Sequence, residues 1–298
     1  MTSLGIKQIL VATDMSDASD RALRYARVFA ETFESNITMF YADPILYATM
    51  QFGAELPVDY PPLLESEAAL DEQLNTQGRE HFGSAIEFTT RIVAGSPIPT
   101  IIRIATETQA DLIIVGTHGH RGLRHFAIGS IAAGVVHAAE RPVLTVRSGA
   151  DDVVPVIRRV LCPVNETEIA RDALRAAAGL ARKFAAELVT VHVIEDERSM
   201  ANATRQIHQW LKLDEMDVSR HRELILRGNA AERLLDCLDD LDVSLLVLGG
   251  QHRLLRDETV IGTTTERLIR FARCPVYTVI HAPRRQGTHR EHEATVAV

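Results

Sequence analysis

The chain has 298 residues, of which 46 % are hydrophobic and 24 % charged, and its formal net charge is −8. At roughly 150 residues per domain this length predicts two domains, and the composition is that of a globular protein. The negative charge argues against nucleic-acid binding, which needs a basic patch, and no apolar run approaches the roughly 20 residues of a membrane span.

Short apolar runs alternate with amphipathic stretches along the first half. Strands are expected near residues 7–12, 36–42, 88–93, 111–116 and 142–147, and helices near 17–34, 63–82, 97–109 and 130–139. Runs such as 112–115 are apolar without alternation, which is typical of strands buried on both faces. The alternation of strands and helices therefore predicts an α/β fold with a parallel sheet.

The second half of the chain repeats the first. The matching segments are 9–14 with 160–165, 37–40 with 188–191, 112–116 with 245–249, 129–130 with 262–263 and 141–146 with 274–279, and Phe33 matches Phe184. The distance along the chain from the second strand to Gly95 is longer than the distance between the matching positions of the second half. The first half therefore carries an insertion near 44–70, with an irregular proline-rich loop at 44–62. We expect domains at 1–147 and 156–282, a linker at 148–155 and a disordered tail at 283–298.

The glycine-rich stretch that follows the fourth strand has the properties of an anion site. Gly116 ends the strand, Gly119 follows after two residues, and Gly129 and Ser130 open the next helix after nine more. Glycines let the backbone approach a phosphate closely, and a helix N-terminus presents unpaired N–H groups at its positive end. Ser130 adds a hydroxyl, which we interpret as the helix N-cap. His120, Arg121 and Arg124 supply charge or hydrogen bonds.

This spacing resembles the nucleotide-binding signature of the universal stress protein family, and the resemblance covers nearly the whole chain. It implies two tandem Rossmann-like domains, each a five-stranded parallel open sheet with helices on both faces. It also implies ATP as the ligand, and whether Mg²⁺ is bound through the phosphates is left open. Asp14 would contact the nucleoside, and Ala42 and Val93 would line the base. The expected phosphate contacts are Gly119, His120, Arg121, Gly129 and Ser130, and the nucleotide set also contains Thr13, Gly116, His118 and Ile131.

Simpler interpretations exist for some of these residues. Asp14 precedes a helix and also fits a turn or capping aspartate. His118, His120 and His125 are an alternative metal site, but no cysteine lies in this half and no second ligand pair is evident, so we expect no metal site. No nucleophile elbow and no acid–base pair stands out, so no catalytic residue is assigned. The expected function is a regulatory or protective stress-response module. A nucleotide-independent interaction scaffold and a weak ATPase are the alternatives.

The second copy departs from the pattern. Asn165 stands at the position of Asp14, His252 takes the place of Gly119, and Asp257 and Glu258 would repel phosphate, so we expect this copy to bind nucleotide weakly or not at all. The terminal strands 142–147 and 275–280 are nearly identical, and single-domain members of the family dimerise through their last strands. We therefore expect these strands to pair edge to edge in an internal pseudo-dimer, with further homo-oligomer formation left open.

Cysteine usage bears on the cellular compartment. Cys162, Cys237 and Cys274 are an odd number at wide spacings, which predicts neither a disulfide framework nor a metal site. Together with the lack of a signal-peptide pattern, this predicts a cytoplasmic protein. The family resemblance implies an adenine nucleotide as its ligand, and the negative charge and the lack of a long apolar run predict no nucleic-acid or membrane partner.

Overall fold

The structure, a computed structural model, describes residues 4–43, 67–117, 129–147, 154–194, 205, 208–210, 220–251, 253–255, 258–260 and 262–281. The predicted loop at 44–62, the tail at 283–298 and most of the linker at 148–155 lie outside these residues. In the described part of the chain, no helix combines the length and the apolar character that crossing a membrane requires.

The first half contains the strands and helices that the sequence predicts, with ends that differ by a few residues. In chain order they are β1 (Gln8–Thr13), α1 (Asp17–Phe33), β2 (Asn36–Asp43), α4 (Glu67–Phe82), β3 (Phe88–Ala94), α5 (Pro97–Glu107), β4 (Leu112–Gly116), α6 (Ser130–Ala138) and β5 (Val143–Val146). Residues 63–66, where the second helix was expected to begin, are not among those described.

The second half repeats this order and adds a hairpin. Its elements are β6 (Arg159–Pro163), α7 (Glu168–Lys183), β7 (Glu187–Ile194), β8 (His221–Arg227), α9 (Ala230–Asp240), β9 (Leu245–Gln251), β10 (Arg253–Leu255), β11 (Glu258–Val260), α10 (Thr263–Phe271) and β12 (Val276–His281). Strands β10 and β11 pair with each other between β9 and α10, at the position of the glycine-rich stretch in the first half. The sequence did not predict this hairpin.

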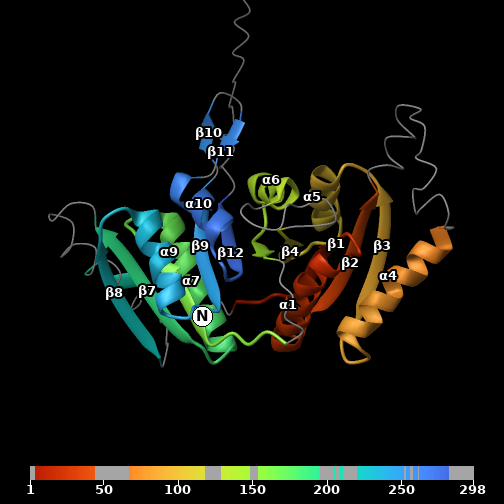
Figure 1. Cartoon of the computed structure of the whole chain (residues 1–298), viewed down its shortest axis with the longest axis horizontal. Helices are drawn as coiled ribbons and strands as arrows, with labels where there is room; N and C mark the ends of the chain where they lie inside the picture. Colours follow the sequence, from red (N-terminus) through yellow and green to blue (C-terminus); the bar gives the residue numbers. More distant parts are fainter. Residues whose placement is uncertain are drawn as a thin grey trace, which may run out of the picture.

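All the long strands belong to one sheet, in the order β3-β2-β1-β4-β5-β12-β9-β6-β7-β8 (Figure 1). Within each half, the strands of this sheet pair parallel, as predicted. In the first half the chain moves outward from β1 to β3 and then returns to place β4 on the other side of β1. The strand order therefore reverses between β1 and β4, and ligands of open α/β sheets bind at such a switch point.

Helices cover both faces of the sheet. One face is packed by α1, α4 and α7, whose apolar side chains form a single buried cluster with residues such as Ile9, Val11 and Val160. The other face is packed by α5, α6, α9 and α10 over residues such as Leu10, Ile113 and Leu246. Each cluster contains residues of both halves, so the hydrophobic core is continuous across the junction.

The two halves meet through the strands that the sequence predicts. Strands β5 and β12 pair antiparallel, and the Cα partners are Val276 with Thr145, Tyr277 with Leu144, and Thr278 with Val143. Leu144 and Tyr277 occupy equivalent positions in the two copies, and the flanking pairs exchange equivalent residues. This reciprocal pattern is that of an isologous interface, which a two-fold axis generates.

Aromatic side chains of α1 and α7 add a second contact between the two halves. Phe184, at the end of α7, lies edge-on to Phe29 and Phe33 of α1, with ring centroids 5.1 and 6.0 Å apart. Phe33 and Phe184 are the equivalent residues of the two copies. Edge-on aromatic pairs stabilise an interface beyond their buried area, so the helices add to the strand pairing.

Candidate functional site

The candidate site lies where β1 and β4 end side by side. Ala12 of β1 is paired with Val115 of β4, so Asp14 and Gly116 follow at the same edge of the sheet, on either side of the switch point. The sequence predicts this juxtaposition, because the carboxyl ends of parallel strands share one edge.

Asp14 forms the turn that leads into α1. Its Oδ1 accepts hydrogen bonds from the Ser16 N–H at 3.2 Å and from the Ser16 hydroxyl at 2.5 Å, and Ser16 is the N-cap position of α1. The turn role weighed from the sequence is therefore present. It engages one carboxylate oxygen in holding the chain between strand and helix, and Asp14 is half-buried.

Asn165 builds the same turn in the second half. Its Oδ1 accepts from the Thr167 N–H at 3.2 Å and from the Thr167 hydroxyl at 2.5 Å, and Thr167 in turn accepts from the Ala170 N–H as the N-cap of α7. The turn therefore needs a side-chain oxygen at this position but not a negative charge. The charge that distinguishes Asp14 from Asn165 has no part in this local geometry.

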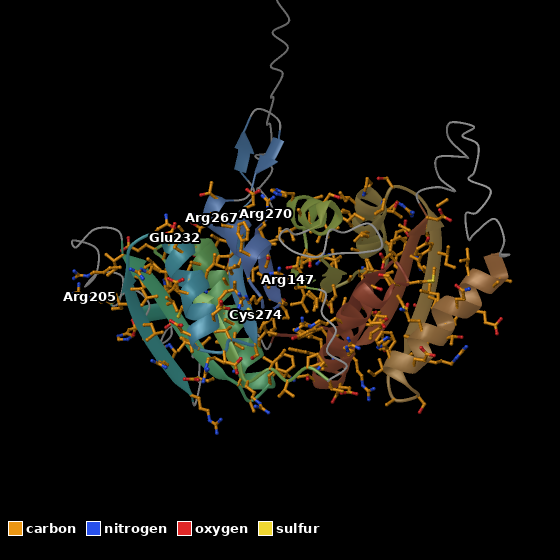
Figure 2. The ribbon with its side chains drawn as sticks, in the orientation of Figure 1. Arg147, Arg205, Glu232, Arg267, Arg270 and Cys274 are labelled. Atoms are coloured by element: carbon orange, nitrogen blue, oxygen red, sulfur yellow. The ribbon has the colours of Figure 1, made fainter. Side chains whose placement is uncertain are left out.

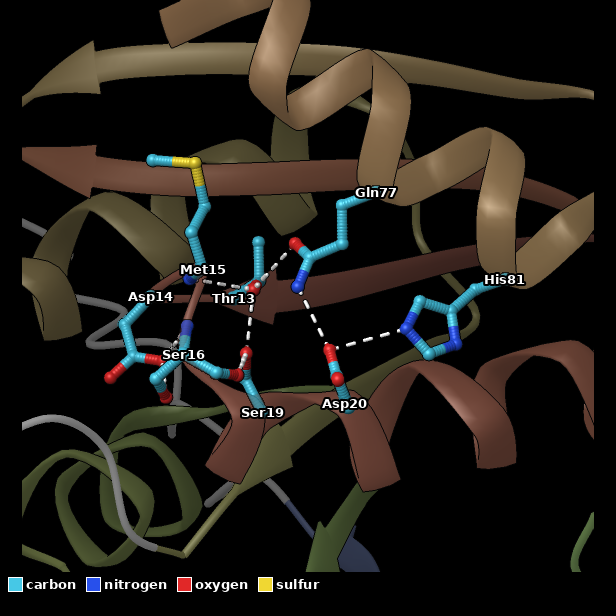
Figure 3. Close-up of polar contacts among 8 residues, drawn as sticks. All are labelled: Thr13, Asp14, Met15, Ser16, Ser19, Asp20, Gln77 and His81. Atoms are coloured by element: carbon cyan, nitrogen blue, oxygen red, sulfur yellow. Dashed lines mark hydrogen bonds and ion pairs between the residues drawn. The ribbon is translucent and has the colours of Figure 1, made fainter. Parts of the chain in front are cut away.

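Thr13 points away from the other predicted residues. Side chains alternate across a strand, so Thr13 faces α1 while Ala12 faces the opposite side of the sheet. Its hydroxyl lies 2.8 Å from the Ser19 hydroxyl and accepts from the Met15 N–H at 2.9 Å (Figure 3). Thr13 is 5 % exposed, so its side chain holds the turn together from the α1 face.

A polar chain that the sequence did not single out continues from Thr13 to α4. Gln77 lies 3.4 Å from the Thr13 hydroxyl and donates to Asp20 Oδ1 at 2.9 Å, and His81 Nε2 lies 3.2 Å from the same oxygen (Figure 3). Gln77 and Asp20 are 57 positions apart in the chain. No local pattern predicts such a contact, which ties α4 to the start of α1.

Ala42 and Val93 are neighbours across the β2–β3 pair, at the same carboxyl edge. Both are half-buried and pack on the face that α5 and α6 cover, together with Ala12. The structure thus brings together the two residues predicted to line a base, on the side of the sheet where α6 begins.

The start of α6 is fixed by a close backbone contact. The Gly129 N–H donates to the Thr117 carbonyl at 2.6 Å, and the Thr117 N–H donates to Val146 at 2.8 Å. A Cβ on Gly129 would lie 2.4 Å from the Thr117 oxygen, so the position needs glycine for close approach. Gly129 is the N-cap, which corrects our assignment of that role to Ser130. Ser130 is the first helical residue, because the extended backbone that ends the loop falls on Gly129, and its side chain is exposed.

The corresponding helix of the second half differs at its start. A Cβ on Gly262, the N-cap of α10, would meet no atom within 4 Å among the residues described. The first turn of α10 contains an acidic residue, Glu266, whereas that of α6 contains none. The Thr265 hydroxyl donates to the Gly249 carbonyl. A carboxylate at a helix N-terminus complements the helix dipole itself.

Part of the predicted site is outside the described residues, namely His118, Gly119, His120 and Arg121, and so is His252 of the second half. Ile131 is described, and it is 43 % exposed at the start of α6. Within the described ranges, which omit residues 118–128, no group of three or more His, Cys, Asp and Glu residues is arranged to hold a metal ion.

Comparison with known proteins agrees with this architecture. The model of the universal stress protein family matches residues 5–147 and 157–279. A universal stress protein of Methanocaldococcus jannaschii is 30 % identical over 144 residues, which cover 47 % of this chain and 82 % of that protein.

One solved structure shares the fold over nearly the whole chain. The crystal structure of a universal stress protein from Archaeoglobus fulgidus has a TM-score of 0.73 at 21 % identity, and the match covers 95 % of this chain and 100 % of that chain. Another from Archaeoglobus fulgidus, solved in complex with dAMP, covers 47 % of this chain and 96 % of that chain, at 23 % identity and a TM-score of 0.34. Because the family model matches both halves over most of their length, the chain belongs to the universal stress protein family and carries two such domains in tandem.

Proposed function

We propose that the first half binds ATP between the carboxyl ends of β1 and β4 and acts as a regulatory binding module rather than as a committed enzyme. The start of α6 carries this proposal. Among the described residues, no side chain caps its first turn, that turn has no acidic residue, and Ser130 is exposed beside it. First-turn N–H groups have no partner inside the helix and lie at its positive end, so they favour a phosphate.

The remaining predicted residues fit the other parts of a nucleotide. Ala42 and Val93 offer an apolar wall for the base, and the Asp14 carboxylate offers a charged acceptor for a ribose hydroxyl. Thr13 contributes backbone only, since its hydroxyl is engaged with Ser19, Met15 and Gln77. The phosphate end comprises Gly116, His118, Gly119, His120, Arg121, Gly129, Ser130 and Ile131, with Mg²⁺ held through the phosphates.

The second half, in this proposal, binds nucleotide weakly or not at all. Asn165 lacks the charge of Asp14, Glu266 occupies the first turn of α10, and the β10–β11 hairpin stands where the first half has its glycine-rich stretch. A carboxylate in the first turn repels a phosphate that approaches the same N–H groups. This half therefore serves as the structural partner.

We also propose that the chain is the covalent equivalent of a dimer of single domains. The reciprocal β5–β12 pairing and the contact between Phe33 and Phe184 support it. Nucleotide binding would then act by shifting the equilibrium between two conformations of the protein. The size of the shift is limited by the difference in ATP affinity between the two conformations.

Isothermal titration calorimetry of ATP, ADP and AMP into the full chain tests the nucleotide site, and Asp14→Asn is the informative variant. Asn165 shows that an asparagine holds the same turn, so the substitution removes the charge and keeps the local structure. We expect ATP affinity to fall about 10-fold, the effect of losing one charge-assisted hydrogen bond, while the melting temperature stays within about 2 °C of wild type.

Asn165→Asp is the matched control, and it should leave both the affinity and a stoichiometry of one nucleotide per chain unchanged. If the wild-type chain binds no adenine nucleotide at millimolar concentration, the interaction-scaffold alternative replaces the proposal. Two nucleotides bound per chain would contradict the assignment of the second half. Steady release of ADP that Ser130→Ala abolishes would favour the weak ATPase.

A further inference from the structure

The turn that carries Asp14 has a backbone feature that its copy in the second half lacks. Met15, directly after Asp14, has a φ of 59°, in the left-handed region that residues with a Cβ rarely adopt. Glu166 is the matching residue of the second half, and its φ is not positive. The hydrogen bonds that Asp14 and Asn165 accept are alike in the two turns, so they do not account for this difference.

Thr13 holds Met15 in this conformation. The Thr13 hydroxyl oxygen accepts the Met15 N–H at 2.9 Å (Figure 3). Val164, at the matching position of the second half, has no hydroxyl to offer. A residue with an unfavourable backbone conformation persists only where its surroundings hold it there, and such residues gather at functional sites. Thr13 is therefore a specific support for the backbone next to Asp14.

The Thr13 hydroxyl is fixed by two further partners. Its one proton has two acceptors within reach, Ser19 Oγ at 2.8 Å and Gln77 Oε1 at 3.4 Å. The Ser19 hydroxyl donates its own proton to the Ser16 carbonyl at 2.7 Å, so it can only accept from Thr13. Both partners draw the Thr13 proton to their side, which leaves the oxygen lone pairs for the Met15 N–H.

Asp20 sets the orientation of the Gln77 amide. Gln77 Nε2 donates to Asp20 Oδ1 at 2.9 Å, and His81 Nε2 lies 3.2 Å from the same oxygen (Figure 3). A carboxylate only accepts, so the amide nitrogen is turned toward Asp20 and the amide oxygen toward Thr13. Gln77 and Asp20 are both half-buried, and a hydrogen bond away from bulk water is electrostatically stronger than one in it.

The second half forms its turn without these residues. Ala170 and Arg171 stand at the positions of Ser19 and Asp20, and neither side chain offers a hydrogen-bond acceptor. Asn165 nevertheless leads from strand to helix there. The network is therefore not needed to begin a helix after the strand. What it adds in the first half is a connection between α4 and the turn beside the proposed nucleoside contact.

Helix α4 lies at the outer end of the first half. The junction of the halves, where Arg147 and Cys274 lie, is on the other side of α1 from α4 (Figure 2). Leu70, Leu74 and Phe82 are the buried apolar residues of α4. Substituting a polar residue of α4 therefore leaves both the junction and the apolar packing of this helix in place.

We propose that Gln77 is a positioning residue of the nucleotide site, which holds the turn at residues 13–16 in the conformation that presents the Asp14 carboxylate to the ribose. The inference rests on the proposed function. Gln77 acts through Thr13, so the affinity for nucleotide depends on where α4 lies. Because the ribose is common to ATP and AMP, the effect is the same for both nucleotides.

The test measures ATP and AMP affinity by calorimetry in the full chain and in Gln77→Leu, which removes both polar ends of the side chain at similar size. We expect both affinities to fall about 5-fold, the equivalent of one hydrogen bond. Asn75→Leu is the matched control on the same helix. Its amide donates to Asp71 within α4, and its loss should change neither affinity.

Gln77→Leu in the Asp14→Asn background separates positioning from a general loss of structure. The charge that Gln77 positions is absent there, so the second substitution should lower ATP affinity by less than about 2-fold. A 5-fold loss in both backgrounds would mean that Gln77 acts independently of Asp14 and would overturn the inference. Unchanged affinity in the single variant would overturn it as well, and both results leave the nucleotide site in place.

Variants of Asp20 test the orientation of the amide. Asp20→Ala frees the Gln77 amide to turn and should reproduce the loss of affinity, whereas Asp20→Asn keeps an oxygen acceptor and should bind ATP as the wild type does. Equal affinities of these two variants would contradict the role of Asp20. A wild-type chain that binds neither ATP nor AMP would overturn the proposed function and this inference together.

Discussion

Gly129 and Gly262 occupy the same position in the two copies, and replacing each by alanine should have different effects. Both are N-cap residues with extended backbone, at φ −62° and −58°, which alanine adopts without strain. The general effects of a Gly→Ala change at an N-cap are therefore common to both variants, and the difference between them isolates the surroundings.

Those surroundings set the magnitude. A Cβ on Gly129 would lie 2.4 Å from the Thr117 carbonyl oxygen, well inside the 3.0 Å that real Cβ atoms keep. The oxygen cannot retreat easily, because the Thr117 N–H is bonded to Val146 and Thr117 is buried. Overpacking of this kind costs about 1–3 kcal/mol. A Cβ on Gly262 would meet no described atom within 4 Å, so the described residues impose no such cost there.

Scanning calorimetry and ATP titration of both variants measure the effect. Gly129→Ala should melt roughly 2–10 °C below Gly262→Ala, and its ATP affinity should fall because the start of α6 must move away from Thr117. Gly262→Ala should bind ATP as the wild type does. Equal melting temperatures for the two variants would refute the argument that the Thr117 carbonyl fixes the start of α6.

Two further predictions concern the junction. Phe184→Ala should lower the free energy of unfolding, measured in urea, by about 2–3 kcal/mol, because Phe184 is half-buried against Phe29 and Phe33. Phe271→Ala is the control: this side chain is 43 % exposed, and its loss should change the free energy of unfolding by less than about 0.5 kcal/mol. Equal losses in the two variants would contradict the aromatic contact. Burial raises the pKa of Tyr277 above its ordinary value of about 10, so its contribution to stability is complete below pH 10 and is lost as pH rises further. Tyr277→Phe should make that alkaline decline shallower by about 1.4 kcal/mol per pH unit, and an unchanged slope would show that the phenol does not titrate with unfolding.

The strands and helices could be predicted because their signal is local. A run such as 112–115 is apolar throughout, and the spacing of Ala22, Ala26 and Phe29 is helical over a single segment. The duplication supplied the rest of the fold, since the pairing of β5 with β12 follows from two nearly identical terminal strands. The hairpin β10–β11 was missed because each strand has three residues and the segment carries charges, so no apolar period marks it.

The candidate site could be located from the sequence but not fully interpreted. The edge that unites Asp14, Ala42, Val93 and Gly116 follows from strand order. The role of Asp14 in the turn does not follow from strand order, because a turn and a ligand would use the same carboxylate. Only the hydrogen bonds to Ser16 in the structure establish it.

Tertiary contacts account for the other omissions. Gly129 and Gly262 match in the alignment of the two copies, yet the first approaches a carbonyl and the second approaches no atom of the residues that the structure describes. The contact from Gln77 to Asp20 joins two helices. Hydrophobic periodicity does not predict this contact, because it depends on how α4 and α1 pack.

The reciprocal strand pairing at the junction has a consequence for how the protein responds to dilution. Two separate domains joined through β5 and its counterpart would dissociate as their concentration falls. Within one chain the linker holds the two edges together, so their association is intramolecular and proceeds at a fixed effective concentration. The β5–β12 pairing therefore persists in a scarce protein as in an abundant one, whereas a pair of separate domains would lose it on dilution.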